Sequence, residues 1–284
     1  MNQHLQTTHE KKSIVVIGAT GKTGRRVVDK LSQQGVAVHG VSRTSTPSFD
    51  WNDQTSWRDV IKGASAIYLT FAPDLAVPGS TQAIAAFVAM AREQQVQRLV
   101  LLSGRGEEEA QRCEQLVLES GIPSTVVRAS WFNQNFSEGE FVAMVEQGTI
   151  ALPAGNIAEP FIDIDDIADV VVTALLNPGH EGEVYEVTGP QLLTFNQIAT
   201  ELSAATGKQI SYQPISLNQF NTSLAESGAP EEMRWLLNYL METVLDGRNS
   251  SVGNGVQRAL GRPPKSFSEF ANAAFAQRNP SISS

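Results

Sequence analysis

The sequence predicts an α/β fold in which a doubly wound parallel sheet is followed by a smaller C-terminal α/β lobe. Short apolar runs alternate with longer helical segments through the first half of the chain. Continuous apolar runs are typical of strands buried on both faces, and their alternation with helices predicts right-handed crossovers between parallel strands. A glycine-rich turn stands between the first strand and the first helix, which is how such sheets often begin.

The expected elements follow in order along the chain. The first strand covers 13–17, and the first helix carries Val27, Val28 and Leu31 at helical spacing before Gly35. Further strands are predicted over 36–41, 66–70, 99–102 and 125–127, with helices over 57–62, 83–95 and 107–119. After Trp131 the alternation loosens, and we expect helices over 141–146, 164–176, 195–206 and 231–245 and a strand over 184–187.

Composition narrows the functional classes. The chain has 284 residues and a net charge of -9, so no long-range positive field attracts nucleic acid, and none is expected as a partner. The single cysteine, Cys113, excludes an intramolecular disulfide and a multi-thiolate metal site and fits a cytoplasmic protein. No apolar run approaches the roughly 20 residues of a membrane span. No paired-histidine motif supports a metal site.

Residues 18–24 read Gly-Ala-Thr-Gly-Lys-Thr-Gly. In a dinucleotide site such glycines allow a tight turn and a close approach of the backbone to the pyrophosphate, while N–H groups at the start of the helix bind the anion. A P-loop is the alternative phosphate site, but its leading glycine would fall on Val16. The turn therefore predicts a Rossmann-type NAD(P)-binding domain over 13–150, after a loose tail over 1–12. A smaller substrate-covering lobe follows over 151–284, with some elements returning to the main sheet.

The end of the second strand favours NADP(H) over NAD(H). An acidic residue is expected about 20 positions after the turn when the ribose 2′-hydroxyl is held, whereas this strand ends in Ser42, Arg43 and Thr44. The guanidinium of Arg43 can pair with a 2′-phosphate, and the two hydroxyls can add hydrogen bonds. Asp50 and Asp53 follow too late to replace the acid, but both are expected near the adenine edge. Trp51 is expected to bind the cofactor as well.

The usual acid–base pair of a short-chain dehydrogenase is missing. That pair is a tyrosine four residues before a lysine. The chain has four tyrosines, and none of them has a lysine at that spacing: they are Tyr68, Tyr185, Tyr212 and Tyr239. Ser103 lacks the surroundings of a hydrolase nucleophile. The acidic run over 107–109 is interpreted as a favourable helix N-terminus without chemistry.

Several segments together resemble the NmrA-like atypical short-chain dehydrogenases. They are the glycine turn, the Phe-Asp-Trp-Asn-Asp segment over 49–53, residues 72–79, the stretch ending in Thr-Val-Val-Arg at 125–128, residues 161–169, and Thr-Gly-Pro at 188–190. The resemblance covers nearly the whole chain. The Asp-Trp pair and the Gly-Arg-Pro-Pro segment over 261–264 are most similar to the festuclavine synthase and agroclavine dehydrogenase branch.

The resemblance implies roles for individual residues. The pyrophosphate would be held at the turn by Gly18, Thr20, Gly21, Thr23 and Gly24, and Lys22 of the same turn is expected to bind the cofactor. Phe71, Ala72 and Pro73 would end a strand beside the nicotinamide ribose, and Ser103 and Gly104 would face the nicotinamide or the substrate. The tyrosine and lysine of the family would fall near Gly106 and Ala110. Their loss puts carbonyl reduction in doubt but leaves cofactor binding intact.

A substrate pocket is expected where the chain leaves the sheet. Trp131, Phe132, Asn133, Asn135 and Phe136 combine aromatic walls with amides, which suit a flat apolar molecule. A core position is at least as good an interpretation for Phe136. Phe161 is placed in the same pocket. Asp163 is kept beside Ser103 as a catalytic candidate, while Asp165 or Asp166 is expected to cap the helix that begins near Ile167.

These residues predict an NADPH-dependent oxidoreductase that delivers hydride to a small electrophilic acceptor. A cyclic iminium ion needs no proton on reduction, and for a quinone, an azo compound or a conjugated acceptor the solvent could supply one. The enzyme would mainly orient the acceptor carbon, about 3–3.5 Å from the nicotinamide. The alternative is a non-catalytic NADP(H) sensor of the NmrA type that acts through a protein partner.

Overall fold

A six-stranded parallel sheet forms the centre of the protein. The computed structural model describes residues 13–276, so the predicted tail over 1–12 lies outside the described residues. The strands lie in the order β2-β1-β3-β4-β5-β8, and every neighbouring pair is parallel. Their bounds are β1 (Ser13–Ile17), β2 (Val38–Val41), β3 (Ala64–Leu69), β4 (Arg98–Gly104), β5 (Ser124–Ala129) and β8 (Val184–Val187). This order confirms the predicted Rossmann-like α/β class and puts the change of winding direction between β1 and β3.

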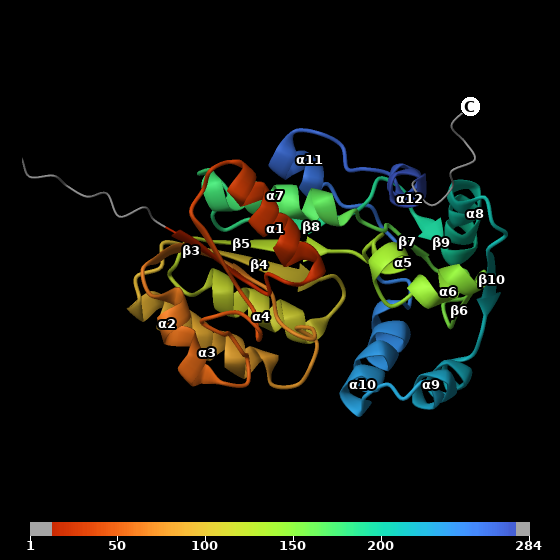
Figure 1. Cartoon of the computed structure of the whole chain (residues 1–284), viewed down its shortest axis with the longest axis horizontal. Helices are drawn as coiled ribbons and strands as arrows, with labels where there is room; N and C mark the ends of the chain where they lie inside the picture. The colour runs from red at the N-terminus through yellow and green to blue at the C-terminus, as the bar shows by residue number, and fades with distance from the viewer. Residues whose placement is uncertain (1–12, 277–284) are drawn as a thin grey trace, which may run out of the picture.

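Helices cover both faces of this sheet (Figure 1). One face carries α1 (Lys22–Gln33), α7 (Ile164–Leu176) and α11 (Gly255–Leu260). The other carries α2 (Trp57–Ile61), after a short 3-10 turn (Gln54–Ser56), together with α3 (Ser80–Glu93) and α4 (Glu108–Leu118). Side chains of β1 alternate between the two layers, with Ile14 and Val16 on one side and Val15 and Ile17 on the other. Both faces of the strand are therefore buried, as its continuous apolar sequence predicts.

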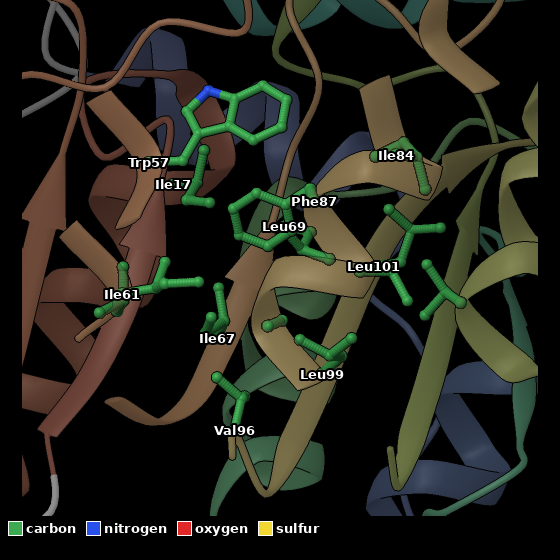
Figure 2. Packing of buried hydrophobic residues seen from close by; sticks show 14 of the residues in the cluster. Ile17, Trp57, Ile61, Ile67, Leu69, Ile84, Phe87, Val96, Leu99 and Leu101 are labelled. Atoms are coloured by element: carbon green, nitrogen blue, oxygen red, sulfur yellow. The ribbon is translucent and has the colours of Figure 1, made fainter. Parts of the chain in front are cut away.

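The core on the α2–α4 side is large and aromatic. Figure 2 shows Trp57, Phe87 and Ile84 of the helices packed over Ile17, Leu69 and Leu101 of the strands. Trp57 and Phe87 are fully buried, with ring centroids 5.7 Å apart. Burial of each such side chain stabilises the fold by about 1.5–3 kcal/mol. This layer holds the carboxyl ends of β3 and β4 in fixed positions.

The second lobe lies beyond the carboxyl end of the sheet (Figure 1). It contains α5 (Asn135–Glu138), α6 (Val142–Gln147), β6 (Thr149–Leu152), β7 (Ala158–Glu159), β9 (Leu193–Thr194), α8 (Phe195–Thr206), β10 (Ser211–Pro214), α9 (Leu217–Glu226), α10 (Glu231–Tyr239) and α12 (Phe267–Phe275). β6 pairs with β10 in parallel, and β7 pairs with β9 in antiparallel orientation. A separate cluster of phenylalanines, including Phe136, Phe161 and Phe195, forms the core of this lobe.

The chain crosses between the two lobes more than once. Residues 164–187 return to the main sheet, where α7 packs beside α1 and β8 pairs with β5. The helix predicted over 231–245 ends earlier, because a π-helical turn over Leu240–Val244 follows α10. Within residues 13–276, no helix is long and apolar enough to cross a membrane.

Candidate functional site

The glycine turn has the geometry of a backbone cradle. Gly18 has φ +76°, and a Cβ added there would lie 2.2 Å from Thr70 Oγ1. A Cβ on Gly24 would lie 2.2 Å from the carbonyl oxygen of Gly18. The backbone N–H groups of Gly18 and Ala19 both donate to the Val41 carbonyl, each at 3.0 Å. The turn is therefore fixed between β1, β2 and the end of β3, with no space for side chains.

The start of α1 fits a dinucleotide pyrophosphate. Gly21 is the N-cap, and no side chain of the described residues caps the first N–H groups of the helix. Uncapped N–H groups together with the helix dipole form an anion site. Gly21 and Thr20 are exposed there, whereas Thr23 is buried and its hydroxyl accepts a hydrogen bond from the Tyr68 hydroxyl at 3.1 Å. Thr23 can thus offer its backbone N–H, while the oxygen of its hydroxyl already accepts from Tyr68.

Lys22 and Arg43 differ in how they are held. Lys22 Nζ donates to Asn135 Oδ1 and to Glu140 Oε2, both at 2.9 Å, and so joins α1 to the second lobe. Arg43 is exposed, and no hydrogen bond or ion pair holds its guanidinium within residues 13–276. The backbone beside it is fixed, because Ser42 N–H donates to Ser45 Oγ at 2.9 Å. Arg43 is therefore available for an anionic group at the end of β2.

The segment over 50–51 supports the end of β3. Trp51 donates its indole N–H to the Thr70 carbonyl at 3.0 Å, and its ring packs on Phe71 with centroids 4.8 Å apart. Asp50 is half-buried and accepts the Asn52 N–H at 3.0 Å. The predicted cofactor residues thus come together at the carboxyl ends of β1, β2 and β3. Open α/β sheets bind their ligands at such a switch point.

A cavity of about 280 Å³ opens beside this turn, between the carboxyl ends of β3–β5 and the second lobe. Ligand pockets start at roughly 300 Å³, so this volume suits a small organic molecule. Aromatic and aliphatic side chains form much of its wall: Phe71, Leu75, Leu102, Trp131, Phe132, Phe141, Met233, Leu236, Leu237, Leu240 and Val244. Lys22 and Thr70 also line it, so the cavity and the glycine turn are adjacent.

Several polar atoms around this cavity are buried without a hydrogen-bond partner among residues 13–276. They are Glu107 Oε2, Ser130 Oγ, Trp131 Nε1 and both carboxyl oxygens of Glu159. Buried polar atoms are normally paired in folded proteins, and an unpaired one costs about 1–3 kcal/mol. A cluster of them at one cavity is typical of a site built for polar groups of a ligand.

Two of these groups are carboxyls with perturbed pKa values. Burial raises the pKa of Glu107 well above its usual range, and the facing Asp74 carboxyl and the charge of Glu114 raise it further. Burial also raises the pKa of Glu159, to about 7, against an opposing effect of Arg105. The Ser130 hydroxyl lies beside Glu159, although neither makes a hydrogen bond of normal geometry. The cavity therefore contains carboxyls that can hold protons near neutral pH.

Ser103 lines the cavity, but its hydroxyl is already engaged. Ser103 Oγ donates to Glu114 Oε1 at 2.6 Å. Arg128 Nε donates to the same oxygen at 2.9 Å, and a second guanidinium nitrogen contacts the other oxygen of Glu114. The Glu114 carboxylate accordingly raises the pKa of Arg128. This network holds the end of β4 against α4 and β5.

Asp163 lies outside the residues that line the cavity. Its carboxylate accepts the Asp165 N–H at 2.7 Å and caps α7, which begins at Ile164. The expectation that Asp165 or Asp166 caps a helix starting near Ile167 is therefore wrong. Asp165 instead pairs with Arg26 and Lys265, and Asp166 pairs with Arg262. The helix begins earlier because Asp163, not a later aspartate, has the extended backbone of an N-cap.

The structure divides the predicted pocket residues into two groups. Trp131, Phe132 and Asn135 line the cavity, as do the predicted cofactor residues Phe71, Pro73, Ser103 and Gly104. Asn133, Phe136 and Phe161 are buried outside its lining, the two phenylalanines in the core of the second lobe. Ala72 is exposed and does not line it. The interpretation of Phe136 as a core residue is confirmed.

Asp74, Glu107 and Glu159 also line the cavity, although their sequence context does not distinguish them. Glu107 was interpreted as part of an acidic run at a helix N-terminus without chemistry. It is the N-cap of α4, but it is only 5% exposed, while Glu108 next to it has a side chain that is 79% exposed. Their positions in the sequence do give one indication, because Asp74 follows β3 and Glu107 follows β4 by a few residues. Carboxyl ends of neighbouring parallel strands meet at one edge of the sheet.

Known proteins of similar sequence span nearly the whole chain. The prestalk A differentiation protein A of Dictyostelium discoideum is 28% identical, covering 98% of this chain and 97% of its own. The NAD(P)H azoreductase of Xenophilus azovorans is 30% identical, covering 92% and 97%. The agroclavine dehydrogenase of Claviceps fusiformis is 29% identical, covering 92% and 96%. The predicted clavine branch is therefore not separated from the other relatives by identity.

Solved structures share the fold. The NADPH-dependent quinone oxidoreductase of Escherichia coli, complexed with NADPH, has a TM-score of 0.79 at 22% identity, covering 92% of this chain and 99% of its own. The Citrobacter triphenylmethane reductase complexed with NADP(H) has a TM-score of 0.73 at 22% identity, covering 94% and 100%. A sequence model described as the NmrA-like family matches residues 10–271. Because that match includes the glycine turn, the cavity and most of the second lobe, the chain belongs to the NmrA-like family.

Proposed function

We propose that this protein is an NADPH-dependent oxidoreductase that delivers hydride to a small electrophilic acceptor without a tyrosine–lysine pair. The observation that carries the proposal is the apolar cavity with unpartnered polar atoms, which lies directly beside a glycine cradle suited to a pyrophosphate. A nucleotide-sensing protein needs the cradle, whereas the cavity adds room for a second small molecule.

The named relatives support this reaction class. One is an NAD(P)H azoreductase and another an agroclavine dehydrogenase, while proteins of the same fold include a quinone oxidoreductase and a triphenylmethane reductase. Their names give different substrates: an azo compound, agroclavine, a quinone and a triphenylmethane compound. We infer an electrophilic acceptor, a class that includes cyclic iminium ions, quinones and conjugated compounds.

The residues at the switch point fit NADPH. The uncapped start of α1 would bind the pyrophosphate, and the exposed guanidinium of Arg43, beside the hydroxyls of Ser42 and Thr44, would bind the 2′-phosphate. Bound NADPH supplies a hydride. Phe71, Ser103 and Gly104 would then lie beside the reactive ring, because they lie at the carboxyl ends of β3 and β4, on one side of the switch point.

The walls of the cavity select the acceptor. Trp131, Phe132 and Phe141 form apolar surfaces against which a flat molecule can pack. The buried carboxyl of Glu159, whose pKa of about 7 leaves it partly ionised at neutral pH, would attract a positive charge on the substrate. This arrangement supports both neutral and cationic conjugated acceptors.

Calorimetric titration of the full-length chain with NADPH and NADH tests the cofactor assignment. Replacing Arg43 by Ala should weaken NADPH binding about 10–100-fold, since a hydrogen-bonded charge pair contributes about 1.5–3 kcal/mol, and should leave NADH binding unchanged. Arg58→Ala is the matched control, because Arg58 is an exposed arginine of the same lobe that pairs with Glu93 at 2.7 Å. No NADPH binding by the unaltered protein would contradict the proposal.

Turnover separates an enzyme from a sensor. The consumption of NADPH should accelerate with at least one member of a panel comprising a cyclic iminium salt, 1,4-naphthoquinone, an azo dye and a cationic triphenylmethane dye. Tight NADPH binding without turnover of any of them would favour the alternative, an NADP(H)-sensing protein that acts through a protein partner.

A further inference from the structure

The strongest unexplained feature of the cavity is a pair of facing carboxyls, those of Asp74 and Glu107. Glu107 is the N-cap residue of α4 and is only 5% exposed, and Asp74 belongs to the loop after β3. Both residues line the cavity, and their carboxyl groups face each other closely enough for each to affect the ionisation of the other. Two facing carboxyls can share a hydrogen bond only when one of them carries a proton.

Glu107 lies directly at the end of the central strand β4. A Cβ added to Gly104 would lie 2.0 Å from Glu107 Oε1, so the absence of a side chain at Gly104 makes room for the carboxyl. Glu107 Oε2 is buried and has no hydrogen-bond donor among residues 13–276. This buried oxygen without a partner is a second observation, beside the facing carboxyls, and it indicates that the cavity binds a ligand at Glu107.

The surroundings of Glu107 favour the protonated form. The titratable groups that face it are Asp74 from the β3–α3 loop, Glu114 from α4 and Tyr239 from α10. None of these is a cation. The α4 N-terminus favours an anion by about 0.3–1 kcal/mol, which is small beside the cost of burying two like charges in contact.

The two cations of the cavity wall are engaged elsewhere. Arg105 donates to the carbonyl oxygens of Asn249 at 3.2 Å and Ser251 at 3.0 Å. Lys22 is paired with Glu140 at 2.9 Å. Among residues 13–276 neither of them forms a hydrogen bond or an ion pair with Glu107. The two facing carboxyls therefore share one proton.

We propose that the Asp74–Glu107 pair is the proton donor of this enzyme, taking the place of the absent tyrosine and lysine. The proposal rests on the proposed function and extends it from acceptors that need no proton to acceptors that do. When hydride reaches one end of a quinone, the electron pair moves to the far oxygen, which becomes an oxyanion. The carboxyl O–H bond breaks, a new O–H bond forms on that oxygen, and the carboxylate regains its proton from water.

Two acceptors with different proton requirements test this step. A cationic triphenylmethane dye becomes neutral on receiving hydride and needs no proton, whereas 1,4-naphthoquinone needs one proton for each hydride. The variants are Glu107→Gln and Asp74→Asn, each nearly isosteric. Glu108→Gln is the matched control, because Glu108 is adjacent in sequence and has a side chain that is 79% exposed.

Both variants should lower kcat for the quinone about 100-fold, the usual contribution of a general acid. They should change kcat for the dye less than about threefold, and Glu108→Gln should change neither. In the unaltered protein, kcat for the quinone should fall at alkaline pH as the pair loses its shared proton, while kcat for the dye should not change over the same pH range. In Glu107→Gln, kcat for the quinone should no longer fall at alkaline pH. Circular dichroism and NADPH affinity confirm that each variant is folded.

Several results would overturn the proposal. Equal losses with both acceptors would show that the pair is structural, and unchanged quinone reduction would show that water supplies the proton. Either result would leave the proposed function standing if the unaltered protein still binds NADPH and reduces the dye. Failure of the unaltered protein to reduce any acceptor would overturn the proposed function and the proton donor together.

Discussion

Glu107 and Glu114 lie about two helical turns apart at one face of α4, and both are buried against the end of β4. Glu114 accepts from Ser103 at 2.6 Å and from Arg128 at 2.9 Å. Glu107 meets another carboxyl and has an oxygen without a donor. Two glutamates at the same helix thus have different roles: Glu114 is held in an ion pair, and we propose that Glu107 carries a proton. The side chains that face each glutamate from other elements decide its role, not the helix itself.

The largest effect is expected from removing the partnered carboxylate. Glu114→Ala should lower the free energy of unfolding by about 3 kcal/mol, because it leaves the Arg128 guanidinium without its main counter-ion. Arg128 keeps Glu186 at 2.9 Å, which places the loss at the lower end of the range for broken buried pairs. Urea unfolding at neutral pH measures the change. A loss below about 1 kcal/mol would mean that the two sites do not differ as described.

Replacing the Glu107 carboxyl should raise the free energy of unfolding at alkaline pH, which is the opposite of the effect expected at Glu114. Glu107 has a raised pKa in the folded state, so its contribution to stability is present at low pH and is lost as pH rises through the folded pKa. Glu107→Gln is neutral at every pH and should therefore leave stability nearly unchanged at pH 4 and raise it by about 1–3 kcal/mol at pH 8. The test is urea unfolding at both pH values. Destabilisation at pH 8 would show that this carboxyl is held as a favourable anion.

Glu159 extends the comparison to another buried carboxyl that lines the cavity. Its pKa of about 7 lies above the usual value of 4.5, so stability from the protonated carboxyl is lost as pH rises through about 7. Glu159→Gln should raise the free energy of unfolding by about 1 kcal/mol at pH 8, and by less at pH 5. The gain is smaller than for Glu107, because Arg105 partly offsets the buried charge. Identical differences at the two pH values would contradict this assignment.

Local sequence was sufficient to predict the glycine turn. Gly18 needs a positive φ and Gly24 has no room for a Cβ, and both requirements follow from a backbone that must turn tightly after a buried strand. Trp131 and Phe132 line the cavity, because they follow β5, whose carboxyl end lies at the same edge of the parallel sheet. The cap of α7 was predicted wrongly, because three nearby aspartates, Asp163, Asp165 and Asp166, could each cap the helix, and only the structure shows that Asp163 does.

The sequence by itself determined the alternation of strands and helices, the glycine turn, the cationic end of β2 and the absence of a tyrosine–lysine pair. These features depend on residues that are close together along the chain. Only the tertiary structure decided that Glu107 is buried while Glu108 is exposed, and that Asp74 faces Glu107 across the ends of β3 and β4. Protonation depends on desolvation and on charges a few ångströms away in space, and such neighbours come from strands and lobes that the sequence keeps far apart.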